Sequence, residues 1–148
     1  MFYKEEKRDL FGVSDNYYLV QCISADFAMG TGIAVQFNKH FNVKENLKRR
    51  YKNVFAGWDS SLEKGFCIQD GRIFNLVTKR HHSHKPTNKT MLNALFDLRE
   101  QARGQKIKLL AMPKIGTGLD KMSWQVVRSI IVEVFKDEPI AILVCVKG

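Results

Sequence analysis

The chain has few of the residues that build disulfide-stapled or membrane-spanning proteins. Its 148 residues include three prolines and three cysteines, Cys22, Cys67 and Cys145, which lie far apart without a Cys-x-x-Cys pair. An odd number of widely spaced cysteines gives neither a disulfide framework nor a zinc site. The longest apolar runs, such as residues 140–146, are much shorter than the roughly 20 residues that a membrane helix needs. We therefore expect buried free thiols and no contact with membranes.

The sequence also lacks repeats, low-complexity tracts and linkers. Residues 1–6 carry charges and form no apolar stretch of signal-peptide length, so we expect an intracellular protein, cytoplasmic or nuclear. Apolar residues make up 45% and charged residues 26%, as in ordinary globular domains. A chain of this length can bury roughly 68–70% of its unfolded surface. We expect one domain over residues 1–148 and, without a heptad pattern, a monomer.

Acidic residues are outnumbered, with 15 Asp and Glu against 24 Lys and Arg, for a net charge of +9. Such a charge favours nucleic acid, an acidic surface or a polyanionic small ligand. Residues 44–52 form the densest basic cluster, which we expect to be one exposed helical face. Charge alone does not select a partner, so nucleic acid stays open as one.

Strand-like runs alternate with helical patterns, which is typical of an α/β domain. Strands are expected at residues 17–23, 65–69, 72–78, 109–112 and 140–146. Three further helices are expected. The first covers residues 33–40, the second begins after an N-cap at Thr87 with Gly104 as its C-terminal stop, and the third begins after Ser123. The apolar side chains that recur along one face of each helix, including Phe96, are expected to pack into the core. Asp70-Gly71 predicts a hairpin, so the fold should be a three-layer α/β/α domain with a mixed central sheet.

Two Gly-Thr-Gly loops, in residues 29–33 and 115–119, are the most informative motifs present. Each lies between an expected strand and an expected helix. Glycine lets backbone N–H groups approach a ligand, and a helix N-terminus attracts phosphate. Neither loop has the spacing of a Walker A loop or of Gly-x-Gly-x-x-Gly, which argues against a nucleotide triphosphatase or a dinucleotide dehydrogenase. Since ligands bind at the carboxyl ends of open α/β sheets, the two loops predict a nucleotide-diphosphate site.

Two side chains near these loops could carry chemistry. Asp120 follows the second loop and could reach the reacting end of a diphosphate ligand. It could equally stabilise the next helix by about 0.3–1 kcal/mol. Lys79 ends the strand at residues 72–78 and would be a nucleophile only after losing its proton; otherwise it is a solvated strand end.

The neighbouring histidines invite a metal hypothesis. His81, His82 and His84 lie in a presumed loop, with no carboxylate or cysteine at ligand spacing. We therefore expect no metal and no cofactor, and a loop that is exposed or faces a phosphate.

Several blocks that occur in this order resemble a macro domain, and more narrowly the terminal ADP-ribose protein glycohydrolase branch. They are Asp9-Leu10-Phe11, residues 22–34, Thr78-Lys79, residues 83–87 and residues 112–120. The resemblance covers nearly the whole chain. Residues 23–26 read Ile-Ser-Ala-Asp, unlike the Asn-Ala-Ala-Asn of another hydrolytic branch.

The resemblance implies a hydrolase that removes mono-ADP-ribose from glutamate and aspartate esters of proteins and also acts on O-acetyl-ADP-ribose. In that branch a lysine attacks the anomeric carbon of the distal ribose, through the ring-opened aldehyde, and an aspartate resolves the adduct. The matching positions are Lys79 and Asp120. The alternatives are a non-catalytic ADP-ribose reader, an ADP-ribose-1″-phosphate phosphatase and a hydrolase of ADP-ribosylated nucleic acid.

The resemblance also implies ligand contacts. It places Asp9 near the adenine amino group, the Leu10 backbone beside the adenine, Ser24 at the phosphates or distal ribose, and residues 114–119 around the diphosphate. Cys145 stands where some relatives have an aromatic residue beside adenine, and Arg8 stands where many have glycine. The expected ligand-binding residues are Asp9, Leu10, Ser24, Met29, Gly30, Gly32, Ile33, Lys114, Ile115, Gly116, Thr117, Gly118, Leu119 and Cys145.

Overall fold

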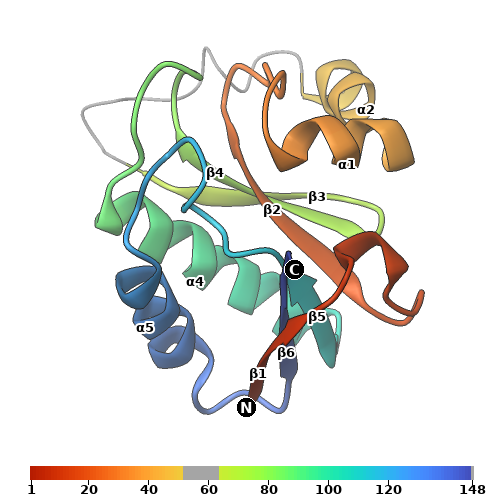
Figure 1. Cartoon of the computed structure of the whole chain (residues 1–148), viewed down its shortest axis with the longest axis vertical. Coiled ribbons are helices and arrows are strands. Elements are labelled where there is room, and N and C mark those ends of the chain that lie inside the picture. Colours follow the sequence, from red (N-terminus) through yellow and green to blue (C-terminus); the bar gives the residue numbers. More distant parts are fainter. Residues whose placement is uncertain (52–63, 148) are drawn as a thin grey trace.

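A mixed six-stranded sheet forms the centre of the molecule (Figure 1). The computed structural model describes residues 1–51 and 64–147. The strand order is β1-β6-β5-β2-β4-β3. The strands are β1 (Phe2–Lys7), β2 (Tyr18–Ser24), β3 (Phe66–Asp70), β4 (Ile73–Lys79), β5 (Leu109–Met112) and β6 (Ala141–Val146). The helices are α1 (Ile33–Phe41), α2 (Val43–Arg50), α4 (Asn88–Gly104) and α5 (Trp124–Phe135), with a short 3-10 turn, η1, at Leu10–Gly12.

The pairing of the strands makes the sheet mixed. The pairs β1–β6, β6–β5, β5–β2 and β2–β4 are parallel, while β3 and β4 are antiparallel. The Asp70-Gly71 turn joins β3 to β4, and Gly71 has the positive φ of +55° that such a turn requires. The predicted hairpin and mixed sheet are confirmed.

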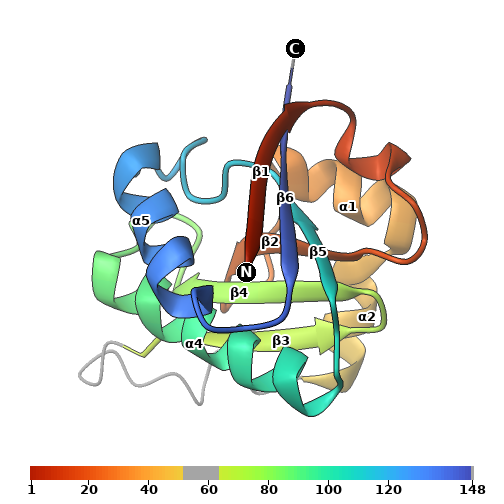
Figure 2. The same cartoon turned by 90° about the horizontal axis from the view of Figure 1, so that it is seen from below.

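Helices cover both faces of the sheet, α4 and α5 on one and α1 and α2 on the other (Figures 1 and 2). Successive residues of β2 pack into different cores, because side chains alternate along a strand. Val20 joins the core under α4 and α5, whereas Leu19 and Ile23 join the core under α1 and α2. The three-layer α/β/α prediction is therefore confirmed.

Helix boundaries follow local capping chemistry. Thr87 caps α4 as predicted, because its hydroxyl accepts from the Thr90 N–H while the Thr90 hydroxyl accepts from the Thr87 N–H. Gly104 was expected to stop this helix, but it is the last helical residue, and the left-handed turn lies at Lys106 with φ of +56°. Ser123 precedes α5 as expected, although no side-chain capping bond from it occurs within the described chain.

Three further features differ from the sequence expectations. The edge strand β1 was not predicted, because its charged and aromatic residues show no apolar alternation. Phe96 was expected in the core but is 37% exposed on the outer side of α4. The basic cluster lies on α2, with Val43 and Leu47 buried beneath its charged face, as predicted; Lys52 lies outside the described residues.

Within the described ranges, no helix has the length and apolarity to cross a bilayer.

Candidate functional site

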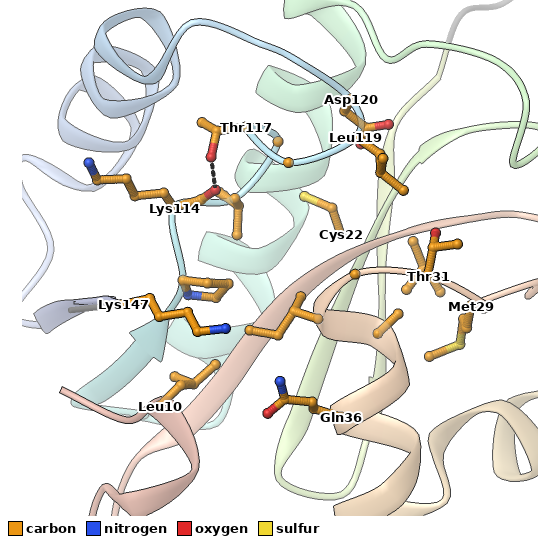
Figure 3. A pocket seen from close by; sticks show the side chains of 18 of the residues that line it. Leu10, Cys22, Met29, Thr31, Gln36, Lys114, Thr117, Leu119, Asp120 and Lys147 are labelled. Atoms are coloured by element: carbon orange, nitrogen blue, oxygen red, sulfur yellow. Dashed lines mark hydrogen bonds between the residues drawn. The ribbon is translucent and has the colours of Figure 1, made fainter. Parts of the chain in front are cut away.

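A cavity of about 1130 Å³ opens at the carboxyl ends of the parallel strands. Its volume exceeds the roughly 300–1,000 Å³ of typical small-molecule pockets. The turn η1, both Gly-Thr-Gly loops, the first turn of α1 and the end of β6 line it (Figure 3). The predicted position of the ligand site is thus the position of a large cavity.

The first glycine loop directs the N-terminus of α1 toward this cavity. Gly32 is the N-cap of α1 with φ of +62°, and Ile33 begins the helix. Because glycine has no side chain that could cap the helix, the first N–H groups of α1 are available to a ligand. Met29 also has a positive φ, +48°, and its side chain is only 7% exposed, within the core under α1 and α2.

The second glycine loop is a tight, internally bonded turn. The Met122 N–H donates to the Gly116 carbonyl over 2.8 Å, and the Thr117 hydroxyl donates to the Lys114 carbonyl over 2.7 Å. Gly116 has φ of +77° and packs closely on Met91 and Met122. This conformation turns the chain back so that Asp120 faces the cavity.

Lys79 and Asp120 meet at one end of the cavity although 41 residues separate them. Lys79 Nζ lies 2.6 Å from Asp120 Oδ1, and the two side chains are 13% and 14% exposed. Lys79 comes from the end of β4 and Asp120 from the second loop. The distance is within the reach of direct proton transfer.

Cys22 lies in the cavity wall beside this pair (Figure 3). Burial raises the pKa of its thiol well above the ordinary value, and the Asp120 carboxylate raises it further. All three cysteines are free, as predicted, but Cys22 is only partly buried because it lines the cavity.

A second link joins the loop after β4 to the second glycine loop. Lys85 Nζ donates to the Leu119 carbonyl over 2.6 Å, next to Asp120. Leu119 itself is 60% exposed at the cavity rim.

Asp26 connects the first loop to the loop after β4. Its Oδ1 accepts from the Ser24 hydroxyl and from the Ala28 N–H, and its Oδ2 lies 3.0 Å from the His82 N–H. Burial raises the pKa of Asp26, but these hydrogen bonds outweigh it and hold the pKa well below its ordinary value. Ser24 thus lines the cavity while its hydroxyl is bonded to Asp26.

Every residue predicted for the site lines the cavity. These are Lys79, Asp120, Asp9, Leu10, Ser24, Met29, Gly30, Gly32, Ile33, Lys114, Ile115, Gly116, Thr117, Gly118, Leu119 and Cys145. Their contacts with a ligand stay predictions. The Asp9 carboxylate accepts from the Phe11 N–H over 3.0 Å, which fixes η1. The Lys114 side chain points out of the cavity, with its Nζ 5.9 Å from the Trp124 ring (Figure 3).

Sequence reasoning missed several lining residues. Gln36 enters from α1, and Lys147 follows β6 and extends its side chain over the cavity (Figure 3). Arg8 also lines it, at the end of the unpredicted strand β1. The pairing of β1 with β6 brings Arg8 and Lys147 together, since the Arg8 N–H donates to the Val146 carbonyl. Had β1 been recognised in the sequence, Arg8 and Lys147 could have been placed at the cavity, because parallel strands end at the same edge of a sheet.

The chain is similar to several known proteins in sequence and in structure. No family model matches the chain. ADP-ribose glycohydrolase OARD1 of Bos taurus is 39% identical over 139 residues, covering 93% of this chain and 87% of the relative. A DNA ADP-ribosyl glycohydrolase of Mycobacterium tuberculosis is 28% identical over 140 residues, which cover 85% of this chain but 37% of the relative. The solved macrodomain of Mycobacterium tuberculosis DarG matches with a TM-score of 0.79 and 25% identity, covering 99% of this chain and 98% of that one.

Proposed function

The chain belongs to the macro domain family, with ADP-ribose glycohydrolase OARD1 among its relatives, and we propose that it is an ADP-ribosyl hydrolase. Its substrates are mono-ADP-ribosylated proteins in which the sugar is linked to glutamate or aspartate, together with O-acetyl-ADP-ribose. The observation that carries this proposal is the Lys79–Asp120 pair, held at 2.6 Å at the end of the cavity.

The diphosphate of ADP-ribose lies between the two glycine loops. The second loop and the first turn of α1 line the cavity, and backbone N–H groups in such positions suit the anionic oxygens of a diphosphate. Asp9 and Leu10, near the ends of β1 and β6, then receive the adenine. This orientation leaves the distal ribose at Lys79 and Asp120.

Lys79 acts as the nucleophile, and Asp120 acts as the general base and acid. Asp120 accepts the proton that the Lys79 ammonium must lose before it can attack. Lys79 Nζ attacks the anomeric carbon of the distal ribose, the bond from that carbon to the ester oxygen breaks, and the protein carboxylate leaves. The ribose ring of this lysine adduct then opens, which gives a lysine–sugar Schiff base. Water adds to the same carbon and releases the lysine, and Asp120 moves the protons that this step requires. The products are free ADP-ribose and the unmodified protein carboxylate, and Lys79 is regenerated.

Hydrolysis of a glutamate-linked mono-ADP-ribosylated protein tests the proposal. We expect Lys79→Ala and Asp120→Ala each to lower kcat by about 100-fold or more, because each removes one reacting group. Lys89→Ala, which changes an exposed lysine at the start of α4, serves as the matched control. Undiminished turnover by Lys79→Ala would remove the proposed nucleophile.

Nucleic-acid-linked ADP-ribose is a second candidate substrate. Two observations favour it, the net charge of +9 and the 28% identity to a DNA ADP-ribosyl glycohydrolase. If DNA is bound, log affinity for ADP-ribosylated DNA falls by about 0.7–0.9 per phosphate contacted for each decade of salt. Turnover of the protein ester alone would exclude this candidate. Binding without any product would instead indicate a reader, and preferred turnover of ADP-ribose-1″-phosphate would indicate a phosphatase.

A further inference from the structure

Three potential metal ligands converge at the rim of the cavity, outside the Lys79–Asp120 pair. They are Asp26, from the loop after β2, and His81 and His82, from the loop after β4. His82 Nδ1 lies 2.9 Å from Asp26 Oδ2, and His81 Nε2 lies 3.6 Å from the same oxygen. No carboxylate lies at ligand spacing from these histidines along the chain, but the fold brings Asp26 to His82 across a separation of 56 residues.

The distances suit a tetrahedral zinc ion. Zinc bonds of roughly 2.0–2.2 Å to nitrogen and oxygen place neighbouring tetrahedral ligand atoms about 3.3–3.6 Å apart. The separation of 3.6 Å between His81 Nε2 and Asp26 Oδ2 lies at the upper end of this range, and the 2.9 Å between His82 Nδ1 and the same oxygen lies slightly below it. All three ligand atoms lie within 4.8 Å of one another.

Neighbouring groups already orient the ligands. His81 Nδ1 lies 2.8 Å from the Ser83 hydroxyl, and its Nε2 is the nitrogen nearer Asp26. The other carboxylate oxygen of Asp26 is held by Ser24 and by the Ala28 N–H. Protein zinc sites show this arrangement, in which hydrogen bonds to the far side of each ligand fix its direction.

We propose that Asp26, His81 and His82 form a zinc-binding site with one open coordination position. Two imidazoles and one carboxylate are a ligand set that zinc favours, and three protein ligands leave a fourth position for water or another oxygen ligand. His82 lines the cavity, so this position lies at its rim. The side chains of Asp26, His81 and His82 are 17%, 39% and 60% exposed, which leaves the ion a path of entry.

This site is independent of the hydrolysis proposed above, which needs only Lys79 and Asp120. A bound ion would join the first glycine loop to the loop that follows Lys79. Because an ion that binds only the folded state stabilises it, zinc should raise the melting temperature.

Titration of the untagged protein with zinc chloride, followed by calorimetry, tests the site. We expect one equivalent to bind, and cobalt chloride to give the visible absorption of tetrahedral cobalt. His81→Ala and Asp26→Asn should each weaken zinc binding by at least about 10- to 100-fold. His84→Ala is the matched control, because His84 belongs to the same loop, with its ring centroid 5.6 Å from that of His81, but not to the cluster.

Melting curves of the metal-free variants show whether each still folds. If Asp26→Asn disturbs the loop, His81→Ala alone decides the question. The proposal is overturned if zinc does not bind, or if His84→Ala loses as much affinity as His81→Ala. The hydrolase activity of Lys79 is measured separately and does not enter this result.

Discussion

At the scale of single residues, Gly116 and Gly118 serve the second loop in different ways. Gly116 has φ of +77°, and a Cβ there would lie 3.0 Å from the Met91 methyl and 3.1 Å from the Met122 sulfur. At Gly118, apart from Gly118 and its two chain neighbours, no atom of the described chain lies within 4 Å of an added Cβ. The fold therefore constrains Gly116, whereas Gly118 borders open space.

Alanine substitutions separate these two roles. Gly116→Ala should lower the melting temperature, because alanine is strained at positive φ and crowds two methionines. Gly118→Ala should leave the melting temperature nearly unchanged but weaken ADP-ribose binding, because the new methyl group stands where the diphosphate approaches. Calorimetric melting and an ADP-ribose titration measure both effects. Equal affinity in wild type and Gly118→Ala would contradict the proposed diphosphate position.

The two glycine loops could be predicted from the residues themselves, because both occur between an expected strand and an expected helix. Lys79 and Asp120 were selected by the resemblance to the macro domain family, since from the residues alone each could equally have a structural role. The Asp26–His82 contact could not be predicted, because a separation of 56 residues carries no local signal. Only the parallel pairing of β2 with β4 places the loops after these strands side by side.

At the scale of elements, Lys85 joins the loop after β4 to the second glycine loop. Its Nζ donates to the Leu119 carbonyl over 2.6 Å, directly before Asp120. We expect Lys85→Ala to lower kcat by about 3- to 10-fold, because the loss of a charged hydrogen bond loosens the position of Asp120. Lys85→Arg should restore part of the rate, and Lys89→Ala is the control. An unchanged kcat in Lys85→Ala would show that the loop holds Asp120 without this bond.

A buried polar pair joins β2 and β4. Gln21 Nε2 donates to Asn75 Oδ1 over 2.9 Å, and Asn75 Nδ2 donates to the Ile68 carbonyl over 3.1 Å. Both side chains are fully buried.

Asn75→Ala should destabilise the protein by about 1–3 kcal/mol, because it leaves the buried Gln21 amide without its acceptor. The double variant Gln21→Leu/Asn75→Leu should cost less than the sum of the single changes, since no polar group is then stranded. Urea unfolding of the wild type, of the single variants Gln21→Leu and Asn75→Leu, and of the double variant measures the coupling. Strict additivity would mean that the pair contributes no mutual stabilisation.

The elements were predictable where hydrophobic periodicity was strong. β2 is an almost continuous run of apolar and buried residues, as expected for a central strand, and the buried positions of α5 recur at helical spacing. β1 was missed because its side-chain contacts come from polar and amphipathic residues rather than from an alternating apolar pattern. Tyr3 donates to Glu5, and the Trp124 ring N–H donates to the same carboxylate from α5. Such a strand is stabilised by partners distant in sequence, so local composition does not reveal it.

At the scale of the whole molecule, the net charge of +9 should influence ligand affinity. ADP-ribose is anionic, and the Debye length falls from about 10 Å at 0.1 M salt to about 3 Å at 1 M. We expect the Kd for ADP-ribose to rise between these salt concentrations, while the Kd for neutral adenosine changes little. Calorimetric titrations at both concentrations compare the two ligands. Parallel changes for both would show that the charge of the protein does not attract the diphosphate.

Covalent trapping tests the central claim, that Lys79 attacks the distal ribose while Asp120 manages the protons. The protein is incubated with substrate and sodium borohydride, which reduces a lysine–sugar Schiff base to a stable amine. Mass spectrometry of the peptides should then find ADP-ribose on Lys79 in the wild type and in Lys89→Ala, and none in Lys79→Ala. An adduct on another residue, or the same yield of adduct in Lys79→Ala, would contradict the account.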